Sequence, residues 1–186
     1  MGYVPCGEIR VAVSGKSGCG NTTVSSMLAQ RLGVKLINYT FRQMAAERGV
    51  PLADIIEAAR NDDFYDRYVD THQVELAEKE SCVLGSRLAV WMLRNADLKV
   101  YLLADDETRA GRIFRREGGS LEQIREFTRM RDMEDSRRYL ELYGIDNTDY
   151  SSANLVIDTA SKAPEDIVCI ILSELARRGL VSETED

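Results

Sequence analysis

Apolar positions along the chain fall into two alternating kinds of segment. Short runs of β-branched and aliphatic residues have the length of buried strands, whereas longer stretches carry apolar residues three or four positions apart, as helices do. The short runs predict strands at residues 9–13, 35–38, 81–84, 98–103 and 154–157. The longer stretches, bounded by glycine, proline or capping residues, predict helices at 22–32, 39–48, 51–60, 62–80, 105–117, 120–143 and 164–178. The acidic tail, 181–186, is expected to fray.

This alternation is typical of an α/β protein. Parallel strands are joined by helical crossovers, so we expect a five-stranded, mostly parallel sheet with helices on both faces, which makes three layers. Such sheets bind their ligands at the carboxyl ends of the strands. The loops at that edge are therefore where the chemistry is expected.

The composition is that of a single domain. Of the 186 residues, 44% are hydrophobic and 30% charged, which supplies a core and excludes a disordered chain. The longest apolar runs are strand-sized and residues 1–7 carry no secretion signal, so we expect a cytoplasmic protein without a membrane segment. The four cysteines lack metal-binding spacing, which predicts reduced thiols and no zinc site.

The charge distribution points to a local anion site. The net charge of -7 disfavours a nucleic-acid binder. Yet 19 of the 24 basic residues are arginine, and nine of these lie with six acidic residues in segment 109–138, giving it a charge of +3. Arginine binds phosphate in a bidentate way, so this segment predicts a site for a small anion. The alternative is a solvated helix face with many ion pairs.

The loop after the first predicted strand has the spacing of a phosphate-binding P-loop at every position but one. Glycines let successive backbone N–H groups curl around phosphate oxygens, and the following helix directs its positive end at the anion. A hydroxyl at Thr22 is expected to bind Mg²⁺. The residues predicted to bind ATP here are Gly15, Lys16, Ser17, Gly18, Cys19, Gly20, Asn21, Thr22 and Thr23.

Asn21 stands where a P-loop carries its lysine. This exchange removes a cation expected to stabilise the charge on the transferred phosphoryl group. Lys16 is a candidate to compensate from the other side of the loop, and the alternative is that Lys16 is only a solvated side chain. Nucleotide binding tolerates this exchange better than catalysis does.

Together with three downstream segments, this loop resembles the archaeal-type branch of the cytidylate kinases. The resemblance rests on residues 14–23, 41–45, 83–91 with 96–99, and 131–146, the last of which carries the R-D-x-x-D-S-x-R signature at 131–138. It implies phosphoryl transfer from ATP to CMP or dCMP with Mg²⁺, on a P-loop nucleoside monophosphate kinase fold. It further implies one kinase domain over 1–186, with a helical monophosphate-binding segment near 39–80 and an arginine-bearing lid near 112–144.

The resemblance also implies roles for individual side chains. Arg42 and Arg87 would hold the acceptor monophosphate with support from Asp70. Arg131 and Arg138, seven residues apart on one helix face, would reach the transferring phosphates. Asp135, which lies between them, would touch the acceptor nucleoside or hold an arginine in place. Arg112 and Arg116 are candidates for the ATP side of the lid, and we expect Lys16 and Arg112 to take part in catalysis.

Two departures from the family pattern concern the acceptor. Gly85-Ser86-Arg87 replaces the usual Glu-Gly-Arg, and Thr71-His72 replaces two arginines. The alternatives that they leave open are a nucleotide-binding regulator that has lost phosphoryl transfer and a kinase of another small acceptor. The sequence leaves the oligomeric state open.

Overall fold

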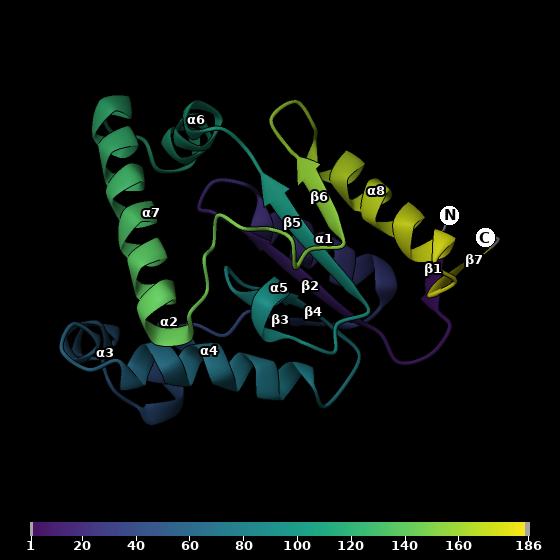
Figure 1. Cartoon of the computed structure of the whole chain (residues 1–186), viewed down its shortest axis with the longest axis horizontal. Helices are drawn as coiled ribbons and strands as arrows, with labels where there is room; N and C mark the ends of the chain where they lie inside the picture. Colours follow the sequence, from purple (N-terminus) through teal and green to yellow (C-terminus); the bar gives the residue numbers. More distant parts are fainter. Residues whose placement is uncertain (1, 185–186) are drawn as a thin grey trace.

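The computed structural model describes residues 2–184, which form an α/β fold of three layers (Figure 1). Five strands make one parallel sheet in the order β3-β4-β2-β5-β6. A separate antiparallel pair joins β1 to β7. The strands are β1 (Gly2–Pro5), β2 (Arg10–Gly15), β3 (Lys35–Ile37), β4 (Cys82–Gly85), β5 (Leu98–Leu103), β6 (Leu155–Asp158) and β7 (Val181–Thr184).

The predicted five-stranded parallel sheet is confirmed, with bounds that differ by one or two residues. The central strand β2 shows why the sheet is covered on both sides. Val11 and Val13 enter the core cluster that contains residues of α1 and α8, whereas Ala12 enters the cluster with residues of α4 and α5. The helices are α1 (Asn21–Leu32), α2 (Phe41–Arg48), α3 (Leu52–Ala59), α4 (Phe64–Ala77), α5 (Ala89–Met92), α6 (Asp106–Glu117), α7 (Leu121–Tyr143) and α8 (Pro164–Arg177).

The C-terminal tail corrects a prediction. Residues 181–184 do not fray but pair with β1, from Pro5 opposite Val181 to Gly2 opposite Thr184. Val181 is 4% exposed and belongs to the main core cluster, so burial of an apolar side chain holds the strand in place. Residues 185–186 of the predicted fraying segment lie outside the described residues.

Helices α6 and α7 begin and end where the sequence predicts. The Asp105 carboxylate caps α6 by accepting from the N–H of Thr108 at 2.7 Å, and the Ser120 hydroxyl accepts from the N–H of Gln123 at the start of α7. Gly118 and Gly119, at φ of 72° and 93°, separate the two helices. Positive φ is strained for other residues, so glycine is required in this sharp break.

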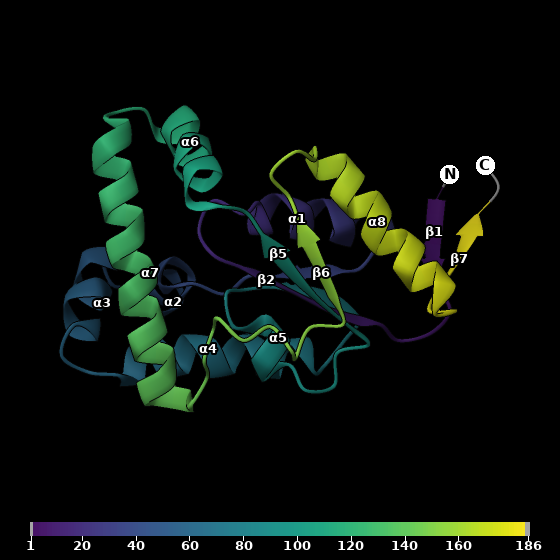
Figure 2. The same cartoon turned by 45° about the horizontal axis from the view of Figure 1, so that its top comes forward.

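The 23-residue helix α7 lies outside the sheet and runs from α6 toward α4 (Figure 2). Helices α2 to α4 carry a core of their own, centred on Tyr39, Met44 and Ile55. The assignment of these regions to a monophosphate-binding segment and a lid stays a prediction. Among the described helices, none is long and apolar enough to cross a membrane.

Candidate active site

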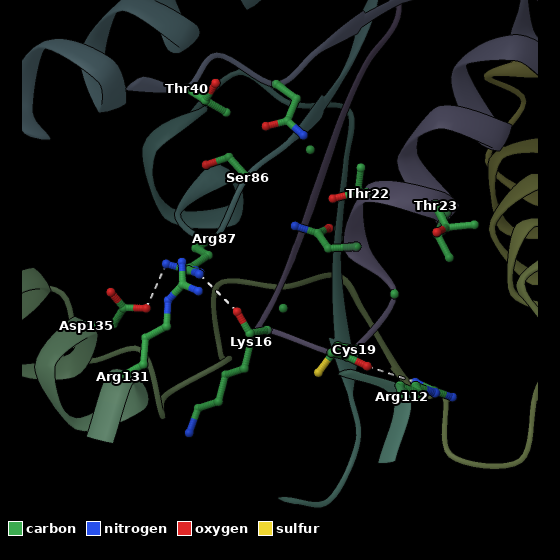
Figure 3. Close-up of a pocket in the computed structure, with 18 of the residues that line it drawn as sticks. Lys16, Cys19, Thr22, Thr23, Thr40, Ser86, Arg87, Arg112, Arg131 and Asp135 are labelled. Carbon is green, nitrogen blue, oxygen red and sulfur yellow. Dashed lines mark hydrogen bonds and ion pairs between the residues drawn. The ribbon is translucent and has the colours of Figure 1, made fainter. Parts of the chain in front are cut away.

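An open cavity of about 1310 Å³ lies at the carboxyl ends of β2 and β4. The nine residues of the predicted phosphate loop, 15–23, all line it. Helices α4, α6 and α7 supply much of the remaining wall, and Figure 3 shows Arg87, Arg131 and Asp135 on the side of the cavity opposite Thr23. The carboxyl edge of a parallel sheet is where such folds bind ligands, so the cavity lies where the sheet topology predicts a binding site.

Two glycines of the loop allow a close approach that no other residue would allow. A Cβ atom on Gly15 would lie 2.8 Å from the backbone oxygen of Leu102. Gly18 has a φ of 85°, and its Cβ would lie 2.9 Å from Cβ of Arg109. The loop therefore packs directly on β5 and α6.

The outer side of the loop is held through its carbonyl groups. Arg109 donates to the carbonyl of Ser17 at 3.1 Å, Arg112 to that of Gly18 at 3.2 Å, and the Thr159 hydroxyl to that of Cys19 at 3.2 Å. The N–H of a trans peptide points opposite to its carbonyl, so the amides of Gly18 and Gly20 point away from these bonds, whereas the N–H of Cys19 donates to the Lys16 carbonyl at 3.1 Å. With α1 beginning at Asn21, the loop presents donors and a positive helix end to the cavity.

Arg109 is the most buried cation at this end of the cavity. Its side chain is 1% exposed, and its Nη2 lies 2.5 Å from Oδ2 of Asp132 and 2.6 Å from Oδ1 of Asp106. Hydrogen bonds to these carboxylates raise the pKa of Arg109 against the opposing effect of burial. The residue connects the loop to α6 and α7.

Asn21, which replaces the P-loop lysine, and Lys16, which is the candidate to compensate for it, both line the cavity. Asn21 has a buried Oδ1 with no hydrogen-bond partner among residues 2–184. Nζ of Lys16 lies 3.7 Å from Oδ2 of Asp132, and Figure 3 shows the side chain pointing away from Thr22. The compensating role of Lys16 stays a prediction.

Ion pairs dominate the opposite end of the cavity. Arg87 lies 2.9 Å from Oδ2 of Asp135 and donates to the Ser17 hydroxyl at 3.0 Å. Arg138 lies 2.8 Å from Asp66 and 3.1 Å from Asp135. Arg131 faces the same cavity but forms no ion pair within the described part of the chain. Partial burial and the neighbouring Arg87 guanidinium lower the pKa of Arg131, so a phosphate would relieve a local excess of positive charge.

Asp70 of α4 lies in a buried hydrogen-bonded cluster beside these pairs. Burial raises its pKa to about 6, although the Tyr143 hydroxyl opposes the shift by donating to Oδ2 at 2.8 Å. The Nε2 atom of Gln73 lies 3.4 Å from Oδ1 of Asp70 and donates to the Ser86 hydroxyl at 2.9 Å.

Comparisons with known proteins identify the family. Residues 10–161 match the model of the cytidylate kinase-like family. The chain belongs to this family. It is 46% identical over 176 residues to "Cytidylate kinase 2" of Borreliella afzelii, covering 92% of this chain and 99% of the relative. It is 40% identical over 167 residues to "Cytidylate kinase" of Archaeoglobus fulgidus, covering 88% of this chain and 93% of the relative.

Solved structures agree on the fold. Shikimate kinase from Acinetobacter baumannii superimposes with a TM-score of 0.63 at 20% identity, over 93% of this chain and 96% of that one. Deoxyadenosine kinase from M. mycoides gives a TM-score of 0.54 at 15% identity, over 90% of this chain and 100% of that one. The predicted P-loop kinase fold is thereby confirmed for this cytidylate kinase-like chain.

The structure brings most of the predicted cytidylate kinase site together. Arg131, Asp135 and Arg138 share one face of α7, as their spacing predicts, and all line the cavity. Four other predicted site residues also line the cavity: Asp70, Arg87, Arg112 and Arg116. Arg112 is held by Gly18 and Thr159, and Arg116 is exposed and pairs with Glu117.

Arg42 is the exception among the predicted site residues. Its side chain on α2 is exposed, and the cavity lining does not include it. Its binding role in this cytidylate kinase-like chain stays a prediction.

Sequence reasoning missed several residues of the site. Asp132 lies within the family signature, and Arg109 is one of nine arginines in its segment, so neither stood out as a partner of the other. Gln73 lies within a polar helix, and Thr159 follows β6 without a recognisable motif. The signal that identifies these residues is burial, which depends on tertiary packing.

Proposed function

We propose that this chain transfers the γ-phosphoryl group of ATP to CMP or dCMP. The observation that carries the proposal is one cavity that is lined by the phosphate loop and by Arg87, Arg131 and Arg138, with Arg87 donating to Ser17 of the loop. A donor and an acceptor phosphate can lie close together in such a cavity. Family membership supports the same activity and does not favour the alternative of a regulator without kinase activity.

The loop end binds the donor. Loop amides and the N-terminus of α1 hold the β- and γ-phosphates of ATP. Asn21 offers an amide in place of the usual cation, so the positive charge for the transition state comes from arginine side chains and, by our proposal, from Lys16. Arg116, which lines the cavity from α6, contacts ATP from the side opposite the loop.

The arginine end binds the acceptor and carries the transfer. Arg87 and Arg138 hold the acceptor phosphate, while Asp135 fixes both arginines through its two oxygens. An acceptor phosphate oxygen attacks the γ-phosphorus, and the bond to the bridging oxygen of ADP breaks. Arg131 stabilises the charge that develops on the transferred group, because no carboxylate within residues 2–184 forms an ion pair with it.

The donor set of the cavity fits Mg²⁺ delivered with ATP. Among the described residues, no group of three His, Cys, Asp or Glu could hold a metal ion by itself. Thr22 presents its hydroxyl to the cavity, and Mg²⁺ is commonly held by one or two protein oxygens together with phosphates and water. When bound through Thr22 and ATP, the ion supplies positive charge to the β- and γ-phosphates.

The domain organisation completes the proposal. Residues 39–80 act as the monophosphate-binding segment, where Arg42 contacts the acceptor when the segment closes. Residues 112–144 act as a lid that excludes water, which would otherwise hydrolyse ATP. A cytoplasmic location stays a prediction from the sequence, and the oligomeric state stays open.

A coupled kinase assay with ATP and Mg²⁺ tests the proposal on CMP, dCMP, UMP and AMP. We expect turnover with CMP or dCMP that exceeds the others. Tight ATP binding without turnover on any acceptor would favour the regulator, and turnover of a different small phosphorylated or hydroxylated metabolite would favour the other alternative.

A further inference from the structure

Gln73 carries a buried acceptor that the protein leaves unmatched. The residue is 2% exposed and lines the cavity from α4. Its Oε1 atom is buried and has no hydrogen-bond partner within residues 2–184. Leaving a buried carbonyl oxygen without a donor costs about 1 to 3 kcal/mol. The atom is therefore suited to a donor that enters the cavity.

The neighbours of Gln73 fix which way its amide faces. Its Nε2 atom lies near Oδ1 of Asp70 and donates to the Ser86 hydroxyl, which also accepts from the N–H of Leu88 at 3.2 Å. A flipped amide would place its oxygen against the Asp70 carboxyl group, and two acceptors repel each other. The amino group is thus held by the protein, and Oε1 is left for a ligand.

The location of Gln73 matches the acceptor rather than the donor. Figure 3 shows its partner Ser86 on the Thr40 side of Arg87, away from Cys19 and Arg112 of the loop end. If Arg87 holds the acceptor phosphate, the nucleoside of that acceptor extends to the same side. The nearby Asp70, Gln73 and Ser86 form a fixed polar wall there.

We propose that Gln73 is a specificity-determining residue that accepts a hydrogen bond from the 4-amino group of the acceptor's cytosine. Cytosine presents a donor at this position, whereas uracil presents an acceptor. Oε1 of Gln73 can accept a hydrogen bond from the cytosine amino group, whereas it is repelled by the carbonyl oxygen of uracil. A site whose buried polar group is left unpaired by the wrong substrate discriminates through kcat/KM. This inference rests on the proposed function and deepens it, because it names the group that selects the base.

The test combines a change in the protein with a change in the substrate. The protein carries Gln73→Leu, which keeps the volume and removes the acceptor. The substrates are CMP, UMP and a CMP analogue with hydrogen in place of the 4-amino group, each assayed for kcat/KM with ATP and Mg²⁺. We expect the wild type to prefer CMP over the analogue by roughly 10- to 100-fold. In Gln73→Leu this preference should fall to within about 3-fold, with an unchanged KM for ATP.

Two further variants separate recognition from folding. Gln30→Leu, at an exposed position of α1 outside the cavity, controls for the exchange itself and should keep the full preference for CMP. Gln73→Met also lacks the acceptor and serves if Gln73→Leu fails to fold, as judged by circular dichroism and thermal unfolding.

The possible failures are distinguishable. If kcat/KM falls by the same factor for CMP, UMP and the analogue in both Gln73 variants, Gln73 does not read the base. A wild type with equal kcat/KM for CMP and the analogue would overturn the role of Gln73 as well. A wild type that binds ATP but turns over none of the three substrates would instead overturn the proposed function, and the base-reading role with it.

Discussion

The two ends of the cavity hold their arginines in opposite ways. At the loop end, Arg109 is 1% exposed and bonded to Asp132, Asp106 and the Ser17 carbonyl. At the acceptor end, Arg87 and Arg138 keep 29% and 33% of their side-chain surface exposed while pairing with carboxylates.

We expect this difference to separate arginines that hold the loop in place from arginines that bind ligand. A buried guanidinium whose two terminal nitrogens are bonded to the protein is not free to bind a phosphate, and it holds the loop in place. A partly exposed guanidinium can exchange a carboxylate for a phosphate oxygen when substrate arrives. The arginines of segment 109–138 are therefore expected to serve two purposes. Some hold the phosphate loop in place, and others recognise the ligand.

The largest expected effect comes from a ligand-facing arginine. Arg131→Ala should lower kcat by about 10³-fold, because its guanidinium faces the cavity and forms no ion pair among residues 2–184, so it is available to stabilise the transferred group. The Kd for ATP should change little. Arg129→Ala, two residues away on α7 but outside the cavity, is the matched control and should keep full activity. Steady-state turnover that is unchanged in Arg131→Ala would remove this residue from the transfer step.

A smaller effect is expected from breaking the buried pair at the loop end. Asp132→Asn leaves Arg109 with only the exposed Asp106 as a charged partner and should lower the free energy of unfolding by about 3 kcal/mol. Urea denaturation measures the change.

Asp66→Asn is the comparison at the acceptor end. Burial raises the pKa of Asp66 despite the attraction of Arg138, so its charge is not well stabilised. Its replacement should cost about 1 kcal/mol, because Arg138 keeps Asp135 as a charged partner. If Asp132→Asn and Asp66→Asn lower the free energy of unfolding equally, the distinction between the two ends is wrong.

The last expected effect concerns the pH dependence of stability. Asp70 has a pKa of about 6 in the folded protein against 3.8 as its ordinary value. The unfolded chain therefore releases this proton first, and the stability contributed by the group falls as pH rises from about 4 to 6. Asp70→Asn removes this dependence, so the unfolding free energy of the variant relative to wild type should rise by roughly 2 to 3 kcal/mol over that window.

Urea titrations at pH 4, 5, 6 and 7 measure the effect of Asp70→Asn. Asp63→Asn, an exposed position at the start of the same helix, is the control and should show no such trend. A difference between Asp70→Asn and wild type that stays flat with pH would mean that Asp70 is not held protonated by burial.

Features encoded locally were predictable from the sequence. The β-branched run of β2, the glycine-rich loop and the caps at Asp105 and Ser120 each depend on neighbours a few positions away. The common cavity face of Arg131, Asp135 and Arg138 follows from helical spacing alone.

Features that depend on distant partners were not predictable. The pairing of β7 joins residues about 180 positions apart, and an isolated acidic tail carries no sign of it. Arg109 and Arg131 are the same residue type in the same segment, and only tertiary packing buries the first against Asp132 and leaves the second facing the cavity. Gln73 is one polar residue in a polar helix until its surroundings are known.

Helix α7 connects the two ends of the cavity mechanically. Asp132 ties it to Arg109 behind the loop, while Arg138 and Tyr143 tie it to Asp66 and Asp70 of α4. We expect a shift of this helix to change contacts at both ends, so that ATP and CMP do not bind independently. By thermodynamic linkage, whatever factor CMP applies to the Kd of ATP, ATP must apply to the Kd of CMP. Measuring the Kd of each nucleotide in the presence of the other would test whether α7 couples the two sites.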